Sequence, residues 1–192
     1  MIGYMMKLHL KTIVMFGLFL TPYFFLLAKD MPFWTYLLLN VVIGIGMAGV
    51  GMNVMHDGNH NSFSRYPWIN KLMGSSIYLL AGNVHNWKVQ HNILHHTYTN
   101  VNGYDEDINP GPVMRFSPHE KRRYLHRFQH IYAWFLYGLM TFMWFLTKDY
   151  KQAVRYEKMG LTATQKITFR RHLTTLIISK TLYGIFILAI PM

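Results

Sequence analysis

The sequence of 192 residues contains no cysteine and only eight acidic residues. Without cysteine the chain cannot use thiol catalysis or bind an iron–sulfur cluster, so any metal must be held by nitrogen or oxygen. Charged residues make up 14% of the chain and hydrophobic residues 52%, whereas soluble domains carry about 25% charged residues. This composition excludes a disordered chain and a disulfide-stabilised secreted module, and it indicates an integral membrane protein.

The basic residues outnumber the acidic ones. Nineteen Lys and Arg give a net charge of +11. Nucleic-acid-binding proteins also carry such a charge, but basic residues beside apolar segments more often mark the cytoplasmic face of a membrane. We therefore expect membrane lipid, and no nucleic acid, as a partner.

Three uncharged or nearly uncharged apolar runs have about the length that crosses a bilayer: residues 13–28, 31–55 and 173–192. The second run is the strongest, and its glycines offer small surfaces on which another helix can pack closely; they are Gly44, Gly46, Gly49 and Gly51. Two shorter runs, residues 72–84 and 131–147, are harder to place. The 13 residues of the first are too few to span, so they predict an interfacial or half-inserted helix.

Charge decides the placement of residues 131–147. Eight Lys and Arg lie between His56 and His130, and seven more lie between Lys148 and His172. If residues 131–147 crossed the bilayer, those seven would lie outside, against the tendency of cytoplasmic loops to hold Lys and Arg. We therefore predict an interfacial helix there, with His56 to His172 cytoplasmic throughout. The expected fold is an all-α polytopic transmembrane helical bundle with cytoplasmic histidine-bearing helices and interfacial helices.

The eleven histidines are the most informative residues. Random placement would give about 0.6 pairs spaced four apart, whereas the chain has three, namely His56/His60, His91/His95 and His126/His130. On a helix such pairs share a face and can bind one metal. The first pair directly follows the strongest apolar run, and His96 adds a third imidazole to the second pair. An amphipathic side chain at the membrane interface explains one such histidine, but not these five together.

Several neighbouring residues are candidates for supporting roles. Asp57, Asp105 and Asp107 could accept hydrogen bonds from imidazole N–H groups, although an exposed acidic turn is the simpler explanation of residues 105–107. The basic residues near the third pair suit a headgroup or an anionic substrate, with metal ligation by His126 and His130 as the alternative; they are Lys121, Arg122 and Arg123. Four tryptophans are predicted to anchor the interface: Trp68, Trp87, Trp134 and Trp144.

Imidazole ligands near carboxylates suit zinc or iron. Five histidines exceed the needs of one zinc site. Two irons that activate dioxygen would need at least this many ligands, and their place beside lipid indicates an acyl chain as the substrate. The residues thus favour redox chemistry on a lipid.

Two motifs carry a resemblance to a known family. They are His56-Asp57-Gly58-Asn59-His60, and His91-Asn92-Ile93-Leu94-His95-His96 with its continuation Thr97-Tyr98-Thr99-Asn100, Gly103 and Asp105-Glu106-Asp107-Ile108. With these, and with His126-Arg127-Phe128-Gln129-His130 and Tyr137-Gly138, the chain resembles the membrane fatty acid desaturases, particularly bacterial acyl-CoA desaturases of the linoleoyl-CoA, front-end type.

The resemblance implies an oxidoreductase that introduces a cis double bond into a fatty acyl chain. Its substrate would be an acyl-CoA or an acyl-lipid, its co-substrate O2, and its electron donor a separate cytochrome b5-like or ferredoxin-like protein. The enzyme would lie in a membrane, expected to be a bacterial inner membrane, with its active site on the cytoplasmic face. Carried over by position, the ligands of two irons would include His56, His60, His91, His95 and His96.

One departure from the family is the absence of its third histidine motif. We therefore expect residues 1–192 to form a single desaturase-like domain that is truncated at its C-terminus and inactive alone. A histidine-motif lipid hydroxylase or ketolase, and a non-catalytic membrane fragment, are the alternatives.

Overall fold

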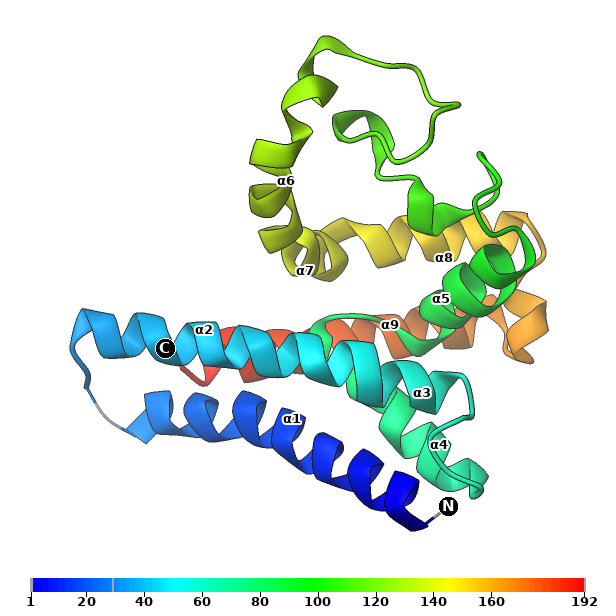
Figure 1. Ribbon diagram of the computed structural model, residues 1–192. Coiled ribbons are helices and arrows are strands. Elements are labelled where there is room, and N and C mark those ends of the chain that lie inside the picture. Colours follow the sequence, from blue (N-terminus) through cyan, green and yellow to red (C-terminus); the bar gives the residue numbers. More distant parts are fainter. Residues whose placement is uncertain (1, 29, 192) are drawn as a thin grey trace. The chain divides into compact units, whose positions relative to one another are not determined.

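A computed structural model describes residues 2–28 and 30–191 (Figure 1). Every regular element in these two ranges is helical, and neither range contains a strand, so the expected all-α class is confirmed. The chain divides into two compact units. Unit 1 comprises Met1–Leu80 and Thr181–Met192, and unit 2 comprises Ala81–Lys180.

Unit 1 begins with a helical hairpin. Helices α1 (Ile2–Ala28) and α2 (Phe33–Gly49) lie side by side (Figure 1). Helix α2 continues through a π-helical segment, η1 (Val50–Met55), into α3 (His56–Asn59), so that the first histidine motif ends a long apolar helix. Next come α4 (Pro67–Gly74) and the 3₁₀ helix η2 (Ser75–Leu80).

Close packing of the hairpin depends on glycine. A Cβ atom added to Gly46 would lie 2.4 Å from the backbone nitrogen of Phe19, and one added to Gly49 would meet the Met15 side chain. The prediction that glycines let another helix pack closely is confirmed at these two positions. Gly44 has nothing within 4 Å of such an atom, because it lies on a different side of α2.

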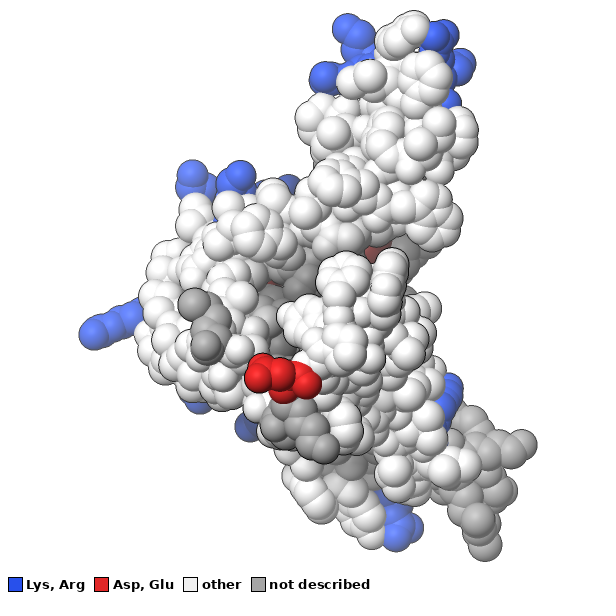
Figure 2. Space-filling view, turned by 90° about the vertical axis from the view of Figure 1, so that its left-hand side faces the viewer, with Lys and Arg blue, Asp and Glu red and all other residues white. Residues whose placement is uncertain are grey.

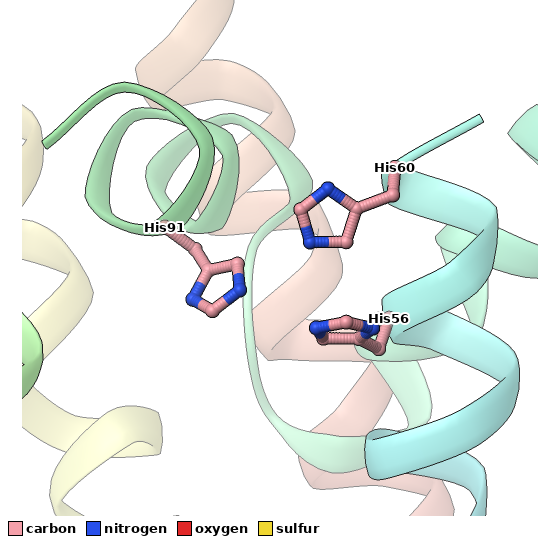
Figure 3. A group of neighbouring side chains, drawn as sticks. All are labelled: His56, His60 and His91. Atoms are coloured by element: carbon pink, nitrogen blue, oxygen red, sulfur yellow. The ribbon is translucent and has the colours of Figure 1, made fainter. Parts of the chain in front are cut away.

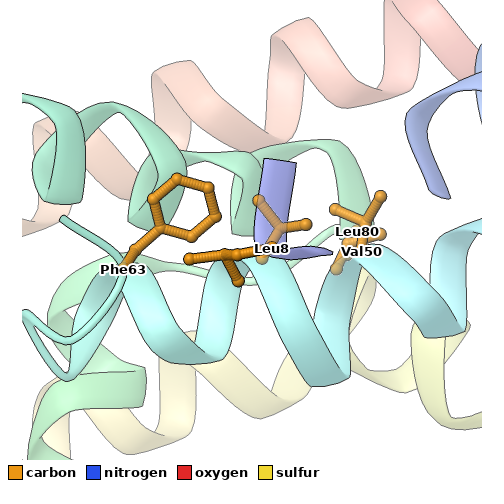
Figure 4. Packing of buried hydrophobic residues seen from close by; sticks show 5 residues of the cluster. Leu8, Val50, Phe63 and Leu80 are labelled. Atoms are coloured by element: carbon orange, nitrogen blue, oxygen red, sulfur yellow. The ribbon is translucent and has the colours of Figure 1, made fainter. Parts of the chain in front are cut away.

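The hydrophobic core of unit 1 includes residues of η1, the segment that directly precedes the first histidine pair in the sequence. Val50 and Val54 of η1 pack with residues from other segments, and Figure 4 shows the labelled members Leu8, Val50, Phe63 and Leu80. Because Leu80 belongs to this core and Ile77 is fully buried, η2 is a protein-covered segment. The prediction of one interfacial or half-inserted helix over residues 72–84 is wrong as to the helix, because α4 ends at Gly74 and positive φ at Ala81 follows the end of η2. The position of this segment relative to the membrane stays a prediction.

Unit 2 carries the second histidine motif. Helix α5 (Val84–Trp87) runs into the π-helical segment η3 (Lys88–His95). A loop with the short 3₁₀ helices η4 (Glu106–Ile108), η5 (Gly111–Val113) and η6 (Tyr124–Phe128) follows. Helix α8 (Asp149–Lys158) packs its buried face on this part, with Tyr156 against Val89 and Leu94.

Within the described residues, three segments are long and apolar enough to cross a membrane: Leu8–Leu27, Phe33–Asn59 and Phe169–Ala189. They correspond to the three predicted runs, with shifted ends because helical hydrogen bonding continues past the charged residues that delimited the runs. The third consists of α9 (Phe169–Gly184) and η9 (Ile185–Ala189). In unit 1, the Tyr23 hydroxyl of α1 donates a hydrogen bond to the Phe186 carbonyl of η9.

Residues 131–147 do not form one continuous helix. They belong to α6 (Gln129–Gly138), α7 (Met140–Met143) and η7 (Trp144–Lys148), with a turn at Leu139. None of the described residues in these elements is buried, and Trp134 is 79% exposed. On the face shown in Figure 2, uncharged residues cover most of the surface. The single helix that was predicted is thus interrupted at Leu139. Exposed aromatic side chains suit an interfacial segment, and the position of these residues at the membrane stays a prediction.

Candidate metal centre

The first histidine pair occupies one face of α3. His56 and His60 project from successive turns (Figure 3), with ring centroids 4.4 Å apart. The His60 N–H donates to the His56 carbonyl at 3.0 Å, so the chain is still helical here. The Nδ1 atom of His56 lies 3.3 Å from Asp57 Oδ1, so Asp57 is within hydrogen-bonding distance of the ring, and its supporting role stays a prediction.

The residues between the two histidines fasten α3 to α4. A Cβ atom on Gly58 would lie 2.4 Å from the backbone nitrogen of Gly74, so the two backbones touch at glycine. The buried Asn59 side chain donates to the Gly74 carbonyl at 3.0 Å. Sequence reasoning assigned no role to Gly58 or Asn59, although glycine between two candidate ligands is itself a sign of close backbone approach.

The second motif brings three imidazoles together on η3 and its end. The His91 and His95 rings are stacked with centroids 5.1 Å apart, and the His96 ring lies edge-on to His91 at 4.9 Å. The Trp87 indole stacks on the other side of His91 at 4.6 Å and is only 9% exposed. The prediction that Trp87 anchors the interface is wrong, because its ring is used to pack against a histidine.

Two carboxylates hold the rings of this motif. His91 Nδ1 lies 2.9 Å from Asp107 Oδ2, and His95 Nδ1 lies 3.0 Å from both oxygens of Asp105. An ionised carboxylate can only accept, so each Nδ1 is assigned the proton, and Nε2 then carries the lone pair that binds a metal. Asp105 is 1% exposed. The simpler alternative of an exposed acidic turn is therefore wrong.

Both carboxylates stay ionised despite their surroundings. Burial opposes ionisation of Asp105, but the Asn100 N–H, the His95 ring and the Asp107 N–H together lower its pKa below the usual range. Burial likewise opposes ionisation of Asp107, and hydrogen bonds from His91 and the Gln90 amide lower its pKa. These aspartates can thus fix the imidazole tautomer at neutral pH.

The donor set fits iron or zinc. Potential ligand atoms of His91, His95 and Asp107 all lie within 4.8 Å of one another; because Asp107 accepts from His91 Nδ1 in this arrangement, the metal donors are the Nε2 atoms of the rings. Imidazole and carboxylate donors without a thiol suit both metals.

Both histidine motifs adjoin π-helical segments. Segment η1 ends at Met55, directly before His56, and η3 contains His91 and His95. Such segments are rare and frequently lie at functional sites. No periodicity in the sequence indicated them.

Helix α8 supports the acidic turn, a role that sequence reasoning missed. Glu106, between the two aspartates, accepts hydrogen bonds from the Tyr156 hydroxyl at 2.6 Å and the Gln152 amide at 3.0 Å, and it pairs with Arg155. Gln152 also donates to Gln90 Oε1 at 2.6 Å. Burial, followed by the charge of Glu106, raises the pKa of the Tyr156 hydroxyl, which therefore stays a donor.

A buried ion pair holds the other end of α8. Lys180 of α9 lies 2.5 Å from Asp149, and these residues are 4% and 1% exposed. Lys180 also donates to the Trp144 carbonyl at 2.8 Å and to the Ala81 carbonyl. Asn86 of α5 donates to the Asp149 carbonyl at 2.7 Å. The helix that leads into the second motif is thereby joined to α8 and α9.

The third histidine pair has a different environment. His126 Nδ1 accepts from the Arg123 N–H at 3.2 Å, and its Nε2 lies 3.1 Å from the Pro112 carbonyl. Both ring nitrogens thus bind backbone groups of the surrounding loop. His130 is exposed on α6. The structure therefore gives no support to these two as ligands. The neighbouring cations are exposed, and a hollow is lined by Arg122, Arg123, Tyr124 and Arg127.

Comparison with known proteins identifies the family. Residues 32–192 match the model of the family described as "Fatty acid desaturase". The sn-1 linoleoyl-lipid 6-desaturase of Arthrospira platensis is 36% identical over 71% of this chain and 37% of its own length. The corresponding enzyme of Synechocystis sp. is 36% identical over 75% of this chain and 40% of its own length. A chloroplastic acyl-lipid (7-3)-desaturase of Chlamydomonas reinhardtii is 30% identical over 80% of this chain and 30% of its own length.

The chain thus spans about two fifths of the length of the first two relatives. No solved structure matches it significantly. The family match covers both histidine motifs and most of the sequence, and the chain therefore belongs to the fatty acid desaturase family.

Proposed function

We propose that this chain carries part of the catalytic centre of a membrane fatty acyl desaturase. In the reaction, two neighbouring methylenes lose two hydrogens and become a double bond. Dioxygen takes up these two hydrogens together with two electrons and two protons, and leaves as two waters. Bound iron would supply the activation of dioxygen that the removal of hydrogen from an unactivated methylene requires.

One observation carries the proposal. The His91 and His95 rings are each fixed through Nδ1 by a carboxylate, Asp107 and Asp105. This arrangement selects the tautomer that metal-binding histidines use and raises the basicity of the ligand. We propose that His91, His95 and His96, with His56 and His60, bind iron, and that Asp57, Asp105 and Asp107 orient the rings. The remaining ligands would come from a third motif outside these residues.

Substrate, donor and location follow from the family and from charge. The similar proteins are named as desaturases of linoleoyl-lipid and acyl-lipid, so we propose an acyl-lipid as the substrate. Exposed Lys121, Arg122 and Arg123 would contact its anionic headgroup. A separate cytochrome b5-like or ferredoxin-like protein would donate electrons. The basic residues between His56 and His172 support an active site on the cytoplasmic face of a bacterial inner membrane.

A chimera tests the proposal. Residues 1–192 are joined to the remainder of the Arthrospira platensis relative, and the fatty acids of expressing cells are analysed by gas chromatography. We expect a new unsaturated product that disappears with His91→Ala and with His60→Ala. His119→Ala, at an exposed histidine, should leave it unchanged. A product that persists in both ligand variants would refute the metal assignment.

A further inference from the structure

Glu106 lies between the two aspartates that hold the imidazoles, yet it contacts neither ring. We propose that Glu106 is a positioning residue: its bonds to α8 fix the turn that carries Asp105 and Asp107, and thereby the orientation of the histidine rings. This inference rests on the proposed function, because it matters only if those rings bind the metal.

The Glu106 carboxylate is fully engaged with α8. Its side chain is 9% exposed. Oε2 accepts from the Tyr156 hydroxyl at 2.6 Å and from the Gln152 amide at 3.0 Å, and Oε1 pairs with the Arg155 guanidinium. A buried carboxylate needs such donors, since leaving it without them would cost its full desolvation. The location of Glu106 is thus determined by α8.

The position of Glu106 also determines the positions of Asp105 and Asp107, because all three belong to one turn. Glu106 begins the single turn η4, and Asp105 is its N-cap: the Asp107 N–H donates to Asp105 Oδ1 at 2.9 Å. The Asn100 N–H holds the other oxygen of Asp105 at 2.8 Å. Because the three acidic residues share one hydrogen-bonded turn, a shift of Glu106 shifts both carboxylates that hold the rings.

A second chain of hydrogen bonds links α8 to Asp107, through Gln90. Gln152 donates to Gln90 Oε1 at 2.6 Å, and Gln90 donates to Asp107 Oδ1 at 2.5 Å. Gln90 directly precedes His91 on η3. Helix α8 therefore reaches the histidine motif both through Glu106 and through Gln90, and Asp107 is held from two directions.

Helix α8 is held in place by buried packing and by polar contacts at its start. Tyr156 and Ala153 are completely buried, and the Tyr156 ring packs against Val89 and Leu94 of η3. At the start of the helix, Asp149 is held by Lys180 and Asn86. The Tyr156 hydroxyl can therefore be removed without emptying the core, which separates positioning from packing.

The test uses Tyr156→Phe, which keeps the ring and deletes the hydrogen bond to Glu106, with Tyr150→Phe on the same helix as the matched control. The full chain is purified in mild detergent and titrated with Co²⁺ as the probe metal, whose visible spectrum reports ligand geometry. In the metal-free protein, NMR records the Nδ1–H resonances of His91 and His95.

We expect Tyr156→Phe to weaken Co²⁺ binding roughly 3- to 10-fold, somewhat less than the ~10–100-fold typical of a residue that touches the ligand. The Co²⁺ spectrum and both Nδ1–H resonances should change, while the melting temperature should fall only modestly below that of Tyr150→Phe, because Gln152 and Arg155 still bind the Glu106 carboxylate. Glu106→Gln should act in the same direction. The double variant should add little, because both changes remove one interaction.

Unchanged Co²⁺ affinity and unchanged resonances in Tyr156→Phe and Glu106→Gln would overturn the inference. His91→Ala separates this failure from that of the proposed function. If His91→Ala abolishes Co²⁺ binding while the two variants behave as wild type, positioning alone is refuted. If His91→Ala leaves binding intact, the metal assignment fails and the inference with it. If the wild-type chain fails to bind Co²⁺, the same titration is made on the chimera with the Arthrospira platensis relative, and failure of the chimera to bind refutes both.

Discussion

The two histidine motifs are held in place by different physics. In unit 1, α3 lies against α4 through backbone contact at Gly58 and Gly74, and the Asn59 side chain donates a hydrogen bond to the Gly74 carbonyl. In unit 2, η3 is held by carboxylates, amides and an ion pair that extend to α8 and α9. The first motif is positioned by shape and the second by charge and hydrogen bonds.

This difference determines how each motif can fail. A position set by close packing fails when volume is added, and it is insensitive to pH and salt. A position set by a buried polar network fails when one partner is removed, because the other is left buried without compensation. Substitutions of matched size can therefore separate the two cases.

The largest effect should come from breaking the buried ion pair. Lys180→Met leaves the buried Asp149 carboxyl without its cation, and breaking a buried pair in this way costs about 3–5 kcal/mol of unfolding free energy. Adding Asp149→Asn to this variant removes the unpaired carboxyl and should recover much of the lost unfolding free energy. Thermal unfolding in mild detergent, followed by circular dichroism, measures both. Equal stability of Lys180→Met and wild type would show that the pair contributes nothing.

A substitution that adds volume tests the close packing that positions the first histidine motif. Gly58→Ala places a Cβ atom where the Gly74 backbone lies, so α3 and α4 must separate. Overpacking of this kind costs about 1–3 kcal/mol. Gly44→Ala is the control, because its Cβ meets nothing within 4 Å. Our account of unit 1 fails if the two variants melt at the same temperature.

A change of charge without a change of size probes the second motif directly. Asp105→Asn removes the ionised acceptor of the His95 N–H, and the expected loss of Co²⁺ affinity is about 10–100-fold. The matched control is Asp30→Asn, at an exposed aspartate. The carboxylate has no orienting role if both variants bind Co²⁺ alike in a spectroscopic titration.

The smallest effect concerns pH. Burial, together with His172, Lys88 and Arg171, lowers the pKa of His85 from 6.5 to about 4. Above pH 6.5 both folded and unfolded chains hold His85 neutral. As pH falls towards 4 the unfolded chain takes up a proton that the folded chain does not, so stability falls. His85→Gln should reduce the loss of melting temperature between pH 7 and pH 5, whereas exposed His119→Gln should not.

The sequence allowed the spans and the histidine motifs to be predicted because their signals are local. Apolar runs and i, i+4 spacing need no knowledge of distant residues, and the three spans appear where they were expected. Hydrogen bonding of Asp105 and Asp107 to the imidazoles was one of two interpretations of the acidic turn, and an exposed turn was the simpler one. The sequence could not decide between buried and exposed carboxylates, because their burial depends on α8.

The remainder depended on contacts between residues far apart in the sequence. Tyr156 and Gln152 lie about 50 residues beyond Glu106, and their pattern of apolar and polar residues indicates merely a charged helix. Trp87 was assigned to the membrane interface on residue type alone. Gly58 was given no role because a glycine in the sequence indicates a close backbone contact but does not identify the segment in contact, here Gly74.

The π-helical geometry of η3 also limits which insertions and deletions this part of the chain can tolerate. In an α-helix each residue turns the chain by about 100° around the axis. A π-helical segment accommodates an additional residue, so a deletion of one residue, such as Lys88, could restore regular α-helix. The helix would survive, but the rings of His91 and His95 would rotate relative to the elements before the deletion. Single-residue length changes here should therefore abolish metal binding while leaving helical content intact, whereas the same change in the exposed loop of residues 101–104 should alter it far less.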